Sequence, residues 1–236
     1  KLYTKLKNKM SSNKIKINQK IKEALQNNKP IVALESTLIS HGLPYPENIK
    51  VAKESIKAVE ESGSVAATIG IINGEIIIGL NENEIEVLAT STNVEKVSLH
   101  NIALSLFNKH NAATTVATSI NIASKIGIKF FATGGIGGVH LRSEDNSYIS
   151  SDLTELSRNR MFVVSSGAKS ILDLEKTYER LETYGIPRIS YNSYYMPGFW
   201  YDETPYTVDQ NFKNIDEIAN YLKLVEETNH NSSILI

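Results

Sequence analysis

Residues 30–80 read PIVALESTLISHGLPYPENIKVAKESIKAVEESGSVAATIGIINGEIIIGL and predict a strand, a helix and a hairpin in succession. The apolar run Ile31–Leu34 is typical of a buried strand. Within Ile49–Val59 the apolar residues recur every three or four positions, which predicts a helix with one buried face. Asn73-Gly74 separates two further apolar runs and is a strong signal for a tight hairpin. The stretch therefore predicts strands that alternate with helices, with one antiparallel hairpin.

The alternation continues to the end of the chain. Further predicted strands cover residues 129–132, 162–165, 188–191 and 232–236, and further predicted helices cover residues 115–125, residues 171–184 and a segment capped by Asn214. We therefore expect an α/β fold with three α/β/α layers around a mixed, largely buried sheet. Residues 29–236 are expected to form a single domain, and residues 1–28 a basic N-terminal extension.

The composition argues against several classes of protein. The chain has 236 residues, a formal net charge of −1 and no cysteine. The balanced charge argues against a globally basic nucleic-acid binder. The lack of cysteine excludes disulfides, thiolate nucleophiles and iron–sulfur clusters. No apolar run approaches the roughly 18 residues of a membrane span.

The first 22 residues contain eight lysines and no acidic residue. Such a segment can be a targeting sequence or a solvated lead-in, and the second interpretation is favoured because transit peptides prefer arginine, which is absent here. We therefore expect a cytoplasmic protein, with an organellar location as the alternative. The apolar residues of Ile15–Leu25 predict one short amphipathic helix within this extension.

Glu35 directly follows the predicted strand Ile31–Leu34. The carboxyl end of a buried strand is where α/β sheets place ligand sites. A half-desolvated carboxylate at that position is suited to donate a proton. An exposed glutamate that caps a turn is the alternative, and the residues alone leave both interpretations open.

Two further turns offer candidate binding groups. Ala113-Thr114-Thr115-Val116 begins a predicted helix, where hydroxyls and free N–H groups suit a phosphate, although an ordinary threonine N-cap is the simpler interpretation. Gly134-Gly135-Ile136-Gly137-Gly138 follows a predicted strand and allows positive φ and close approach of a ligand. This run is not a dinucleotide fingerprint, because His140 stands where a small residue is required.

Lys169 follows another predicted strand and precedes the helix predicted over residues 171–184. Partial desolvation and a helix N-terminus both favour an uncharged, nucleophilic amine. A solvated surface lysine is the alternative. The aromatic residues of the loop beyond this helix could cover a base, but a buried loop core or a subunit contact explains them equally and is favoured. They are Tyr191, Tyr194, Tyr195, Phe199, Trp200 and Tyr201.

Taken together, these segments resemble the pseudouridine-5′-phosphate glycosidases, also called the indigoidine synthase A family. The resemblance is carried by Val32–Pro46, Ala67–Ile69, Lys96–Ser98, Ala113–Val116, Phe131–His140 and Ser166–Asp173. It runs from about Pro30 to the end of the sequence. Because family chains continue further, we expect the C-terminal part of the family domain to be missing here.

The resemblance implies reversible cleavage of pseudouridine 5′-phosphate into uracil and ribose 5-phosphate. A C-glycoside has no leaving heteroatom to protonate, so an electron sink must form on the sugar carbon. Ring opening and an iminium with a lysine amine supply this sink. The resemblance implies that Lys169 is the Schiff-base nucleophile, Glu35 the proton donor and Asp152 a further acid–base member. It assigns substrate binding to Lys96, Thr115, Val116, Ser150, Ser151 and Gly135.

The resemblance also implies a divalent manganese ion held by an aspartate. The equivalent position here is Tyr148, and a tyrosine is a poor ligand for a hard divalent ion. Glu144 or Asp145 could substitute from the same loop. The manganese site is therefore expected from the family but weakened at Tyr148.

Two functions follow from this resemblance. The first is an active glycosidase, which the four polar residues Glu35, Lys96, Asp152 and Lys169 favour. The second is a catalytically weak relative that binds a sugar phosphate or acts in assembly, which Tyr148 favours. The resemblance further implies a homotrimer that acts on a small molecule, without nucleic-acid or membrane partners.

Overall fold

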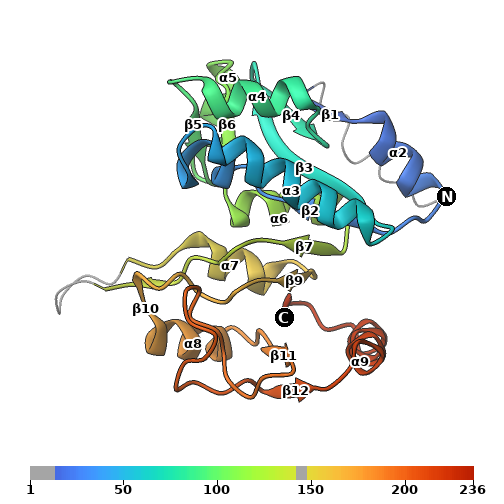
Figure 1. The fold of residues 1–236 in the computed structure, drawn as a ribbon, viewed down its shortest axis with the longest axis vertical. Helices are drawn as coiled ribbons and strands as arrows, with labels where there is room; N and C mark the ends of the chain where they lie inside the picture. The colour runs from blue at the N-terminus through green and yellow to red at the C-terminus, as the bar shows by residue number, and fades with distance from the viewer. Residues whose placement is uncertain (1–13, 142–147) are drawn as a thin grey trace. The chain divides into compact units, whose positions relative to one another are not determined.

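The computed structural model describes residues 14–141 and 148–236. The chain divides into two compact units, residues 1–129 and residues 130–236, and each is described by itself. Both units combine strands with helices, which confirms the mixed α/β class (Figure 1). Within the described residues, no helix has the length and apolar character needed to cross a membrane.

The first unit is built on a mixed sheet around β3. Its strands are β1 (Ile15–Ile17), β2 (Ile31–Leu34), β3 (Val65–Ile72), β4 (Glu75–Ile78), β5 (Glu95–Val97) and β6 (Ala112–Thr114). β4 pairs antiparallel with the second half of β3, and β1 extends that side. β2 pairs parallel with the first half of β3, whereas β6 pairs antiparallel with the second half and carries β5. The carboxyl ends of β2 and β6 therefore meet beside β3.

Helices flank this sheet. They are α2 (Gln19–Gln26), the π-helical turn η1 (Leu38–Gly42), α3 (Glu47–Glu61), α4 (Glu82–Thr90), α5 (Ile102–Phe107) and α6 (Val116–Lys125). One core cluster joins η1, α3 and α4 to the sheet, and its members are Ile39, Ala52, Ile77, Leu80, Ile85 and Leu88. Each large side chain of this cluster stabilises the fold by roughly 1.5–3 kcal/mol through the apolar surface removed from water.

The hairpin prediction is confirmed. Asn73 and Gly74 connect β3 to β4 with φ angles of 50° and 73°. Positive φ at both central residues is the geometry of a type I′ turn, whose twist matches that of the flanking strands.

Part of the predicted N-terminal extension belongs to the first unit. Ile15–Ile17 forms β1 and pairs with β4, so a single helix over Ile15–Leu25 is wrong for its first part. The helix α2 begins only after Asn18, whose side chain accepts a hydrogen bond from the N–H of Lys20. Ile21 of α2 is buried, which anchors the segment. Residues 1–13 lie outside the described residues, and the boundary at residue 29 stays a prediction.

The second unit has a parallel sheet and two small ribbons. Its strands are β7 (Phe130–Ala132), β8 (Val139–His140), β9 (Phe162–Val164), β10 (Leu172–Asp173), β11 (Ile189–Tyr191), β12 (Gln210–Phe212) and β13 (Ile234–Leu235). β7, β9 and β13 pair in parallel in that order, whereas β8 pairs antiparallel with β10, and β11 pairs parallel with β12. Its helices are α7 (Ser151–Arg158), α8 (Leu174–Thr183) and α9 (Ile215–Glu227).

The predicted helix over residues 171–184 begins late. Leu172–Asp173 pairs with Val139–His140 as a short antiparallel ribbon, and α8 starts only at Leu174. Apolar spacing could not reveal this pairing, because the partner strand lies about thirty residues earlier in the chain. Lys169 therefore lies in the loop before the ribbon. The expectation that a helix N-terminus acts directly on its amine is wrong.

Asp173 caps α8 and supplies a test of this boundary. Its carboxylate accepts a hydrogen bond from the N–H of Lys176 (3.1 Å). This backbone hydrogen bond lowers the pKa of Asp173 below its ordinary value. A depressed pKa means that the charged cap stabilises the fold at neutral pH and that this contribution is lost as the pH falls through the folded-state pKa.

We expect Asp173→Ala to lower the free energy of unfolding by about 1 kcal/mol at pH 7, because an N-cap is lost. The deficit relative to the parent should narrow as the pH falls below about 4. Urea unfolding at several pH values measures both effects. Asp173→Asn keeps a capping oxygen without a titrating charge, so its difference from Asp173→Ala should not depend on pH. A difference in the free energy of unfolding between Asp173→Ala and the parent that does not change below about pH 4 would contradict the proposed role of the charged cap.

Candidate active site

Glu35 emerges at the carboxyl end of β2 and is half-buried. The next residue, Ser36, is fully buried, and its hydroxyl accepts a hydrogen bond from the N–H of Thr114 (2.9 Å). The hydroxyl of Thr37 donates to the carbonyl of Thr114 (2.8 Å). These bonds fix the turn on which Glu35 leaves the sheet. The predicted position of Glu35 at a strand end is confirmed, while its catalytic role stays a prediction.

Thr114 connects this turn to α6. Its hydroxyl donates to the carbonyl of Ile69 (2.7 Å) and lies 2.8 Å from the hydroxyl of Ser119. Thr115 caps α6, because its side chain accepts a hydrogen bond from the N–H of Thr118. Val116 is the first helical residue and is buried. The simpler interpretation of Thr115 as an N-cap is thus confirmed.

Lys96 lies on β5, in register with Ala113 of β6, and is exposed. The N–H of Thr115 donates to the carbonyl of Val97 (3.1 Å), which joins the end of β5 to the start of α6. Together with the bonds around Thr114, this contact brings Glu35, Lys96 and Thr115 to one edge of the first unit. This edge combines a carboxylate, a cation and a helix N-terminus.

In the second unit, residues 134–138, called the glycine loop below, pair with the segment that carries Lys169. The N–H of Ile136 donates to the carbonyl of Gly167 (3.0 Å), and the N–H of Lys169 donates to the carbonyl of Ile136 (3.1 Å). A third bond joins the N–H of Ser166 to the carbonyl of the loop's first residue (3.1 Å). The backbone of Lys169 is therefore anchored, and its side chain is half-buried.

The glycine loop also holds Asp152. The carboxylate of Asp152 accepts a hydrogen bond from the N–H of Gly137 (2.8 Å) and is buried in the first turn of α7. Ser150 is the N-cap of α7, and Ser151 is its first helical residue. The structure thus brings Asp152, Ser150 and Lys169 around the same loop, as separate stretches of the sequence could not show.

Close approach of neighbouring groups, not backbone conformation, requires glycine at positions 135 and 137 of this loop. Among the described residues, those with positive φ do not include any glycine of the loop. A Cβ atom at Gly137 would lie 2.8 Å from the carboxylate of Asp152. A Cβ atom at Gly135, a predicted substrate-binding residue, would lie 2.6 Å from the ring of Phe199. The positive φ that these glycines permit is therefore not used here, and the close contacts that the structure shows are made by side chains, while the approach of a ligand stays a prediction.

Tyr148 precedes Ser150 and is 58% exposed. Its ring contacts that of His140 edge-on, with the centroids 5.0 Å apart. Within residues 14–141 and 148–236, no three His, Cys, Asp or Glu side chains are grouped as a metal site would require. Glu144 and Asp145, the suggested substitute ligands, lie outside the described residues. The manganese site therefore stays a prediction.

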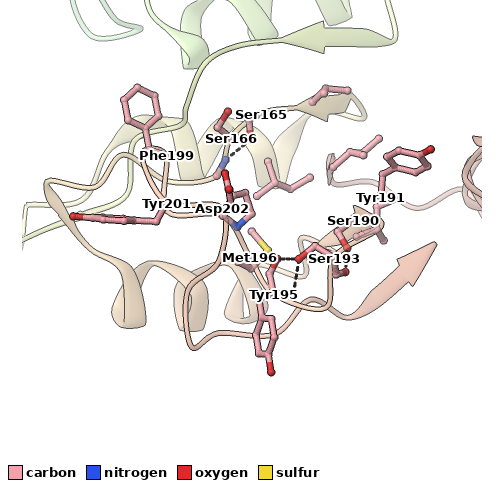
Figure 2. A pocket seen from close by; sticks show the side chains of 16 residues that line it. Ser165, Ser166, Ser190, Tyr191, Ser193, Tyr195, Met196, Phe199, Tyr201 and Asp202 are labelled. Carbon is pink, nitrogen blue, oxygen red and sulfur yellow. Dashed lines mark hydrogen bonds between the residues drawn. The ribbon is translucent and has the colours of Figure 1, made fainter. Parts of the chain in front are cut away.

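A pocket of about 380 Å³ lies at the carboxyl ends of β9, β11 and β13 (Figure 2). Its hydroxyl groups include those of Ser165, Ser166, Ser190 and Ser193, and its lining includes neither Lys169 nor Asp152. Four of the predicted aromatic residues line it, namely Tyr191, Tyr195, Phe199 and Tyr201. A buried loop core is the wrong interpretation of this cluster, because Trp200 is 77% exposed and Tyr201 is 64% exposed.

Comparison with known proteins identifies the family. The family model described as indigoidine synthase A like protein matches residues 20–236. The pseudouridine-5′-phosphate glycosidase of Brachyspira hyodysenteriae is 46% identical over 220 residues, which cover 93% of this chain and 71% of that protein. The enzyme of the same name from Geobacillus kaustophilus is 46% identical over 218 residues, which cover 92% of this chain and 72% of that protein.

Solved structures agree with this result. An indigoidine synthase A-like protein from Thermotoga maritima superposes with a TM-score of 0.83 at 34% identity and covers 94% of this chain, which in turn spans 72% of that protein. The prealnumycin C-glycosynthase AlnA, in complex with ribulose 5-phosphate, superposes with a TM-score of 0.86 at 37% identity, with 95% and 72% of the two chains covered. Because the family model spans both units and these relatives match nearly the whole chain, this protein belongs to the indigoidine synthase A family.

Proposed function

We propose that this protein cleaves the carbon–carbon glycosidic bond of pseudouridine 5′-phosphate and releases uracil and ribose 5-phosphate. The observation that carries the proposal is the 46% identity to pseudouridine-5′-phosphate glycosidases over more than nine-tenths of the chain. The polar residues that the reaction needs are present in both units, namely Glu35 and Lys96 in the first and Asp152 and Lys169 in the second.

The proposed chemistry uses Lys169 as the nucleophile. Its uncharged amine bonds to C1′ of the ribose while the bond from C1′ to the ring oxygen breaks, and Glu35 gives its proton to that oxygen. The nitrogen, now a secondary ammonium, loses a proton to the carboxylate of Asp152, which frees its lone pair. Asp152 passes this proton to C5 of uracil, the bond from C1′ to C5 breaks, and the nitrogen lone pair forms a C1′=N iminium. Water hydrolyses the iminium, which frees ribose 5-phosphate and restores the amine. Asp152, held at the glycine loop, is the proposed acid–base partner near Lys169.

Two observations support this scheme. Ribulose 5-phosphate, the ligand named for the solved relative, has its C5 oxygen esterified and therefore stays an open chain. An open-chain pentose phosphate is also the form in which the proposed imine exists. Lys96 and the start of α6 at Thr115 combine a cation with the positive end of a helix dipole, which suits the phosphate end of the substrate.

Imine trapping tests this scheme directly. Incubation with ribose 5-phosphate and borohydride should attach a reduced pentose phosphate to Lys169, as located by peptide mass spectrometry. Lys169→Arg keeps the positive charge but cannot form the imine, so it should lose the adduct and lower uracil release by about 10³-fold or more. Lys176→Arg is the matched control and should keep both. An adduct confined to other lysines, or none on the parent protein, would sink the proposed chemistry.

The manganese expected from the family is treated separately, and no step above depends on it. We propose that Tyr148 weakens manganese binding relative to the aspartate of the family, because a neutral phenol is a poorer ligand than a carboxylate for a hard ion. After treatment with a chelator, uracil release by Tyr148→Asp should increase with added Mn²⁺ more steeply than release by the parent protein. Tyr148→Phe should respond as the parent does. If added Mn²⁺ increases uracil release by the parent protein but not by Tyr148→Phe, the phenol is instead identified as a ligand.

The remaining expectations stay predictions. They are a homotrimeric assembly, a cytoplasmic or, alternatively, organellar location, and the absence of nucleic-acid and membrane partners. Tyr148 favours the second function, a catalytically weak or inactive relative that binds a sugar phosphate or acts in assembly. Imine trapping on Lys169 distinguishes that function from an active glycosidase.

A further inference from the structure

The segment Pro197–Phe199 contacts both the glycine loop and the segment that carries Lys169. The N–H of Phe199 donates to the carbonyl of Ser166 (2.9 Å), and Gly198 forms an antiparallel bridge with Gly167. Phe199 has φ of 67°, in the left-handed region that side chains other than glycine seldom adopt. A bulky residue kept in this conformation is strained, and the surrounding contacts must offset that strain.

The ring of Phe199 lies against the glycine loop. A Cβ atom at Gly135 would lie 2.6 Å and 2.9 Å from two carbons of this ring, and 3.2 Å from the carbonyl oxygen of Gly167. A Cβ atom at Gly134 would lie 3.6 Å from the ring, which is an ordinary contact. The ring therefore occupies the space that only a glycine at position 135 leaves open.

Tyr178 of α8 ties the same segment to the residue before Lys169. Its side chain is buried, and its hydroxyl donates to the carbonyl of Pro197 (2.9 Å). The backbone of Ala168 is a second hydrogen-bond partner of this hydroxyl. Burial raises the pKa of Tyr178 to about 12, so the phenol stays protonated and able to donate at neutral pH.

We propose that Phe199 and Tyr178 are positioning residues that hold the Lys169 segment against the glycine loop in the register needed for attack on the pentose. This inference rests on the proposed function for its catalytic consequence. Neither residue needs to touch the substrate, because each acts through the backbone that carries Lys169. A displacement of about 1 Å at a reacting group can cost about 100-fold in rate, so loosening this register lowers turnover more than substrate binding.

A double-mutant cycle tests the contact between ring and loop. Gly135→Ala should lower the rate of imine trapping by ribose 5-phosphate by about 100-fold, because the new methyl group collides with Phe199. In a Phe199→Ala background, the same change should cost at least about 10-fold less, since the ring is gone. Gly134→Ala is the matched control and should cost little in either background. Additive losses would overturn the assignment of Phe199.

Tyr178→Phe tests the second contact without changing the packed volume. It should lower kcat for uracil release by about 10-fold with little change in KM. Tyr206 is the control, because its ring lies beside that of Tyr178 with the centroids 5.3 Å apart, and Tyr206→Phe should change neither constant. Equal decreases of kcat in both variants, or a change in KM without a decrease of kcat, would overturn the assignment of Tyr178.

Amide hydrogen exchange separates this inference from the proposed function. Phe199→Leu and Tyr178→Phe should each speed exchange at the N–H groups of Ile136 and Lys169. The control variant Ile215→Ala, at an exposed position of α9, should not. This readout needs no turnover, so it supports or overturns the positioning role even if the parent protein fails to form the imine. Unchanged exchange in both positioning variants would overturn the inference.

Discussion

Three backbone hydrogen bonds join the glycine loop to the Lys169 segment. Two of them involve Ile136, which donates to Gly167 and accepts from Lys169. Each such bond adds only about 0.5–1.5 kcal/mol net, but leaving its groups unpaired in the interior costs more. The register between the two segments is therefore fixed, because breaking these hydrogen bonds would leave buried backbone groups unpaired. Since the same loop also binds the carboxylate of Asp152, one constraint sets the backbone positions of both proposed acid–base and nucleophilic groups.

In the first unit, hydrogen bonds of buried side-chain hydroxyl groups fix the turn that carries Glu35. There the turn after β2 is fixed by buried hydroxyl groups, with Thr114 linking Ser36, Ile69 and Ser119. Buried polar groups are expensive unless all are satisfied, so such a network specifies one arrangement of the turn. Glu35 is carried by this turn, and Thr115 begins α6 beside it. In both units, hydrogen bonds of neighbouring residues thus fix the turn that carries a proposed catalytic residue, Glu35 in the first unit and Lys169 in the second.

Much of this could be predicted from the sequence where the cause is local. The φ preferences of Asn73-Gly74 specify the hairpin, and the side chains of Thr115 and Asn214 specify the starts of α6 and α9. Glu35 is a candidate because it directly follows an apolar run, and Lys169 because it lies between a predicted strand and a predicted helix. These signals need only neighbouring residues.

The remaining features depend on partners far away in the chain. The ribbon of β8 and β10 delays α8, and no helical periodicity reveals a pairing with residues 139–140. Phe199 acquires its significance from a contact with Gly135, and Tyr178 from one with Pro197. In the sequence Phe199 is one aromatic residue among several, and its positive φ has no local signature. Tertiary contacts, which periodicity does not encode, decide these features.

A crystal structure of the protein soaked with ribose 5-phosphate would show whether Lys169 forms the imine. We expect continuous electron density from Nζ of Lys169 to C1 of an open-chain pentose phosphate, with the glycine loop pairing unchanged. A closed furanose bound without a covalent link, or a pentose phosphate bound away from Lys169, would contradict this expectation.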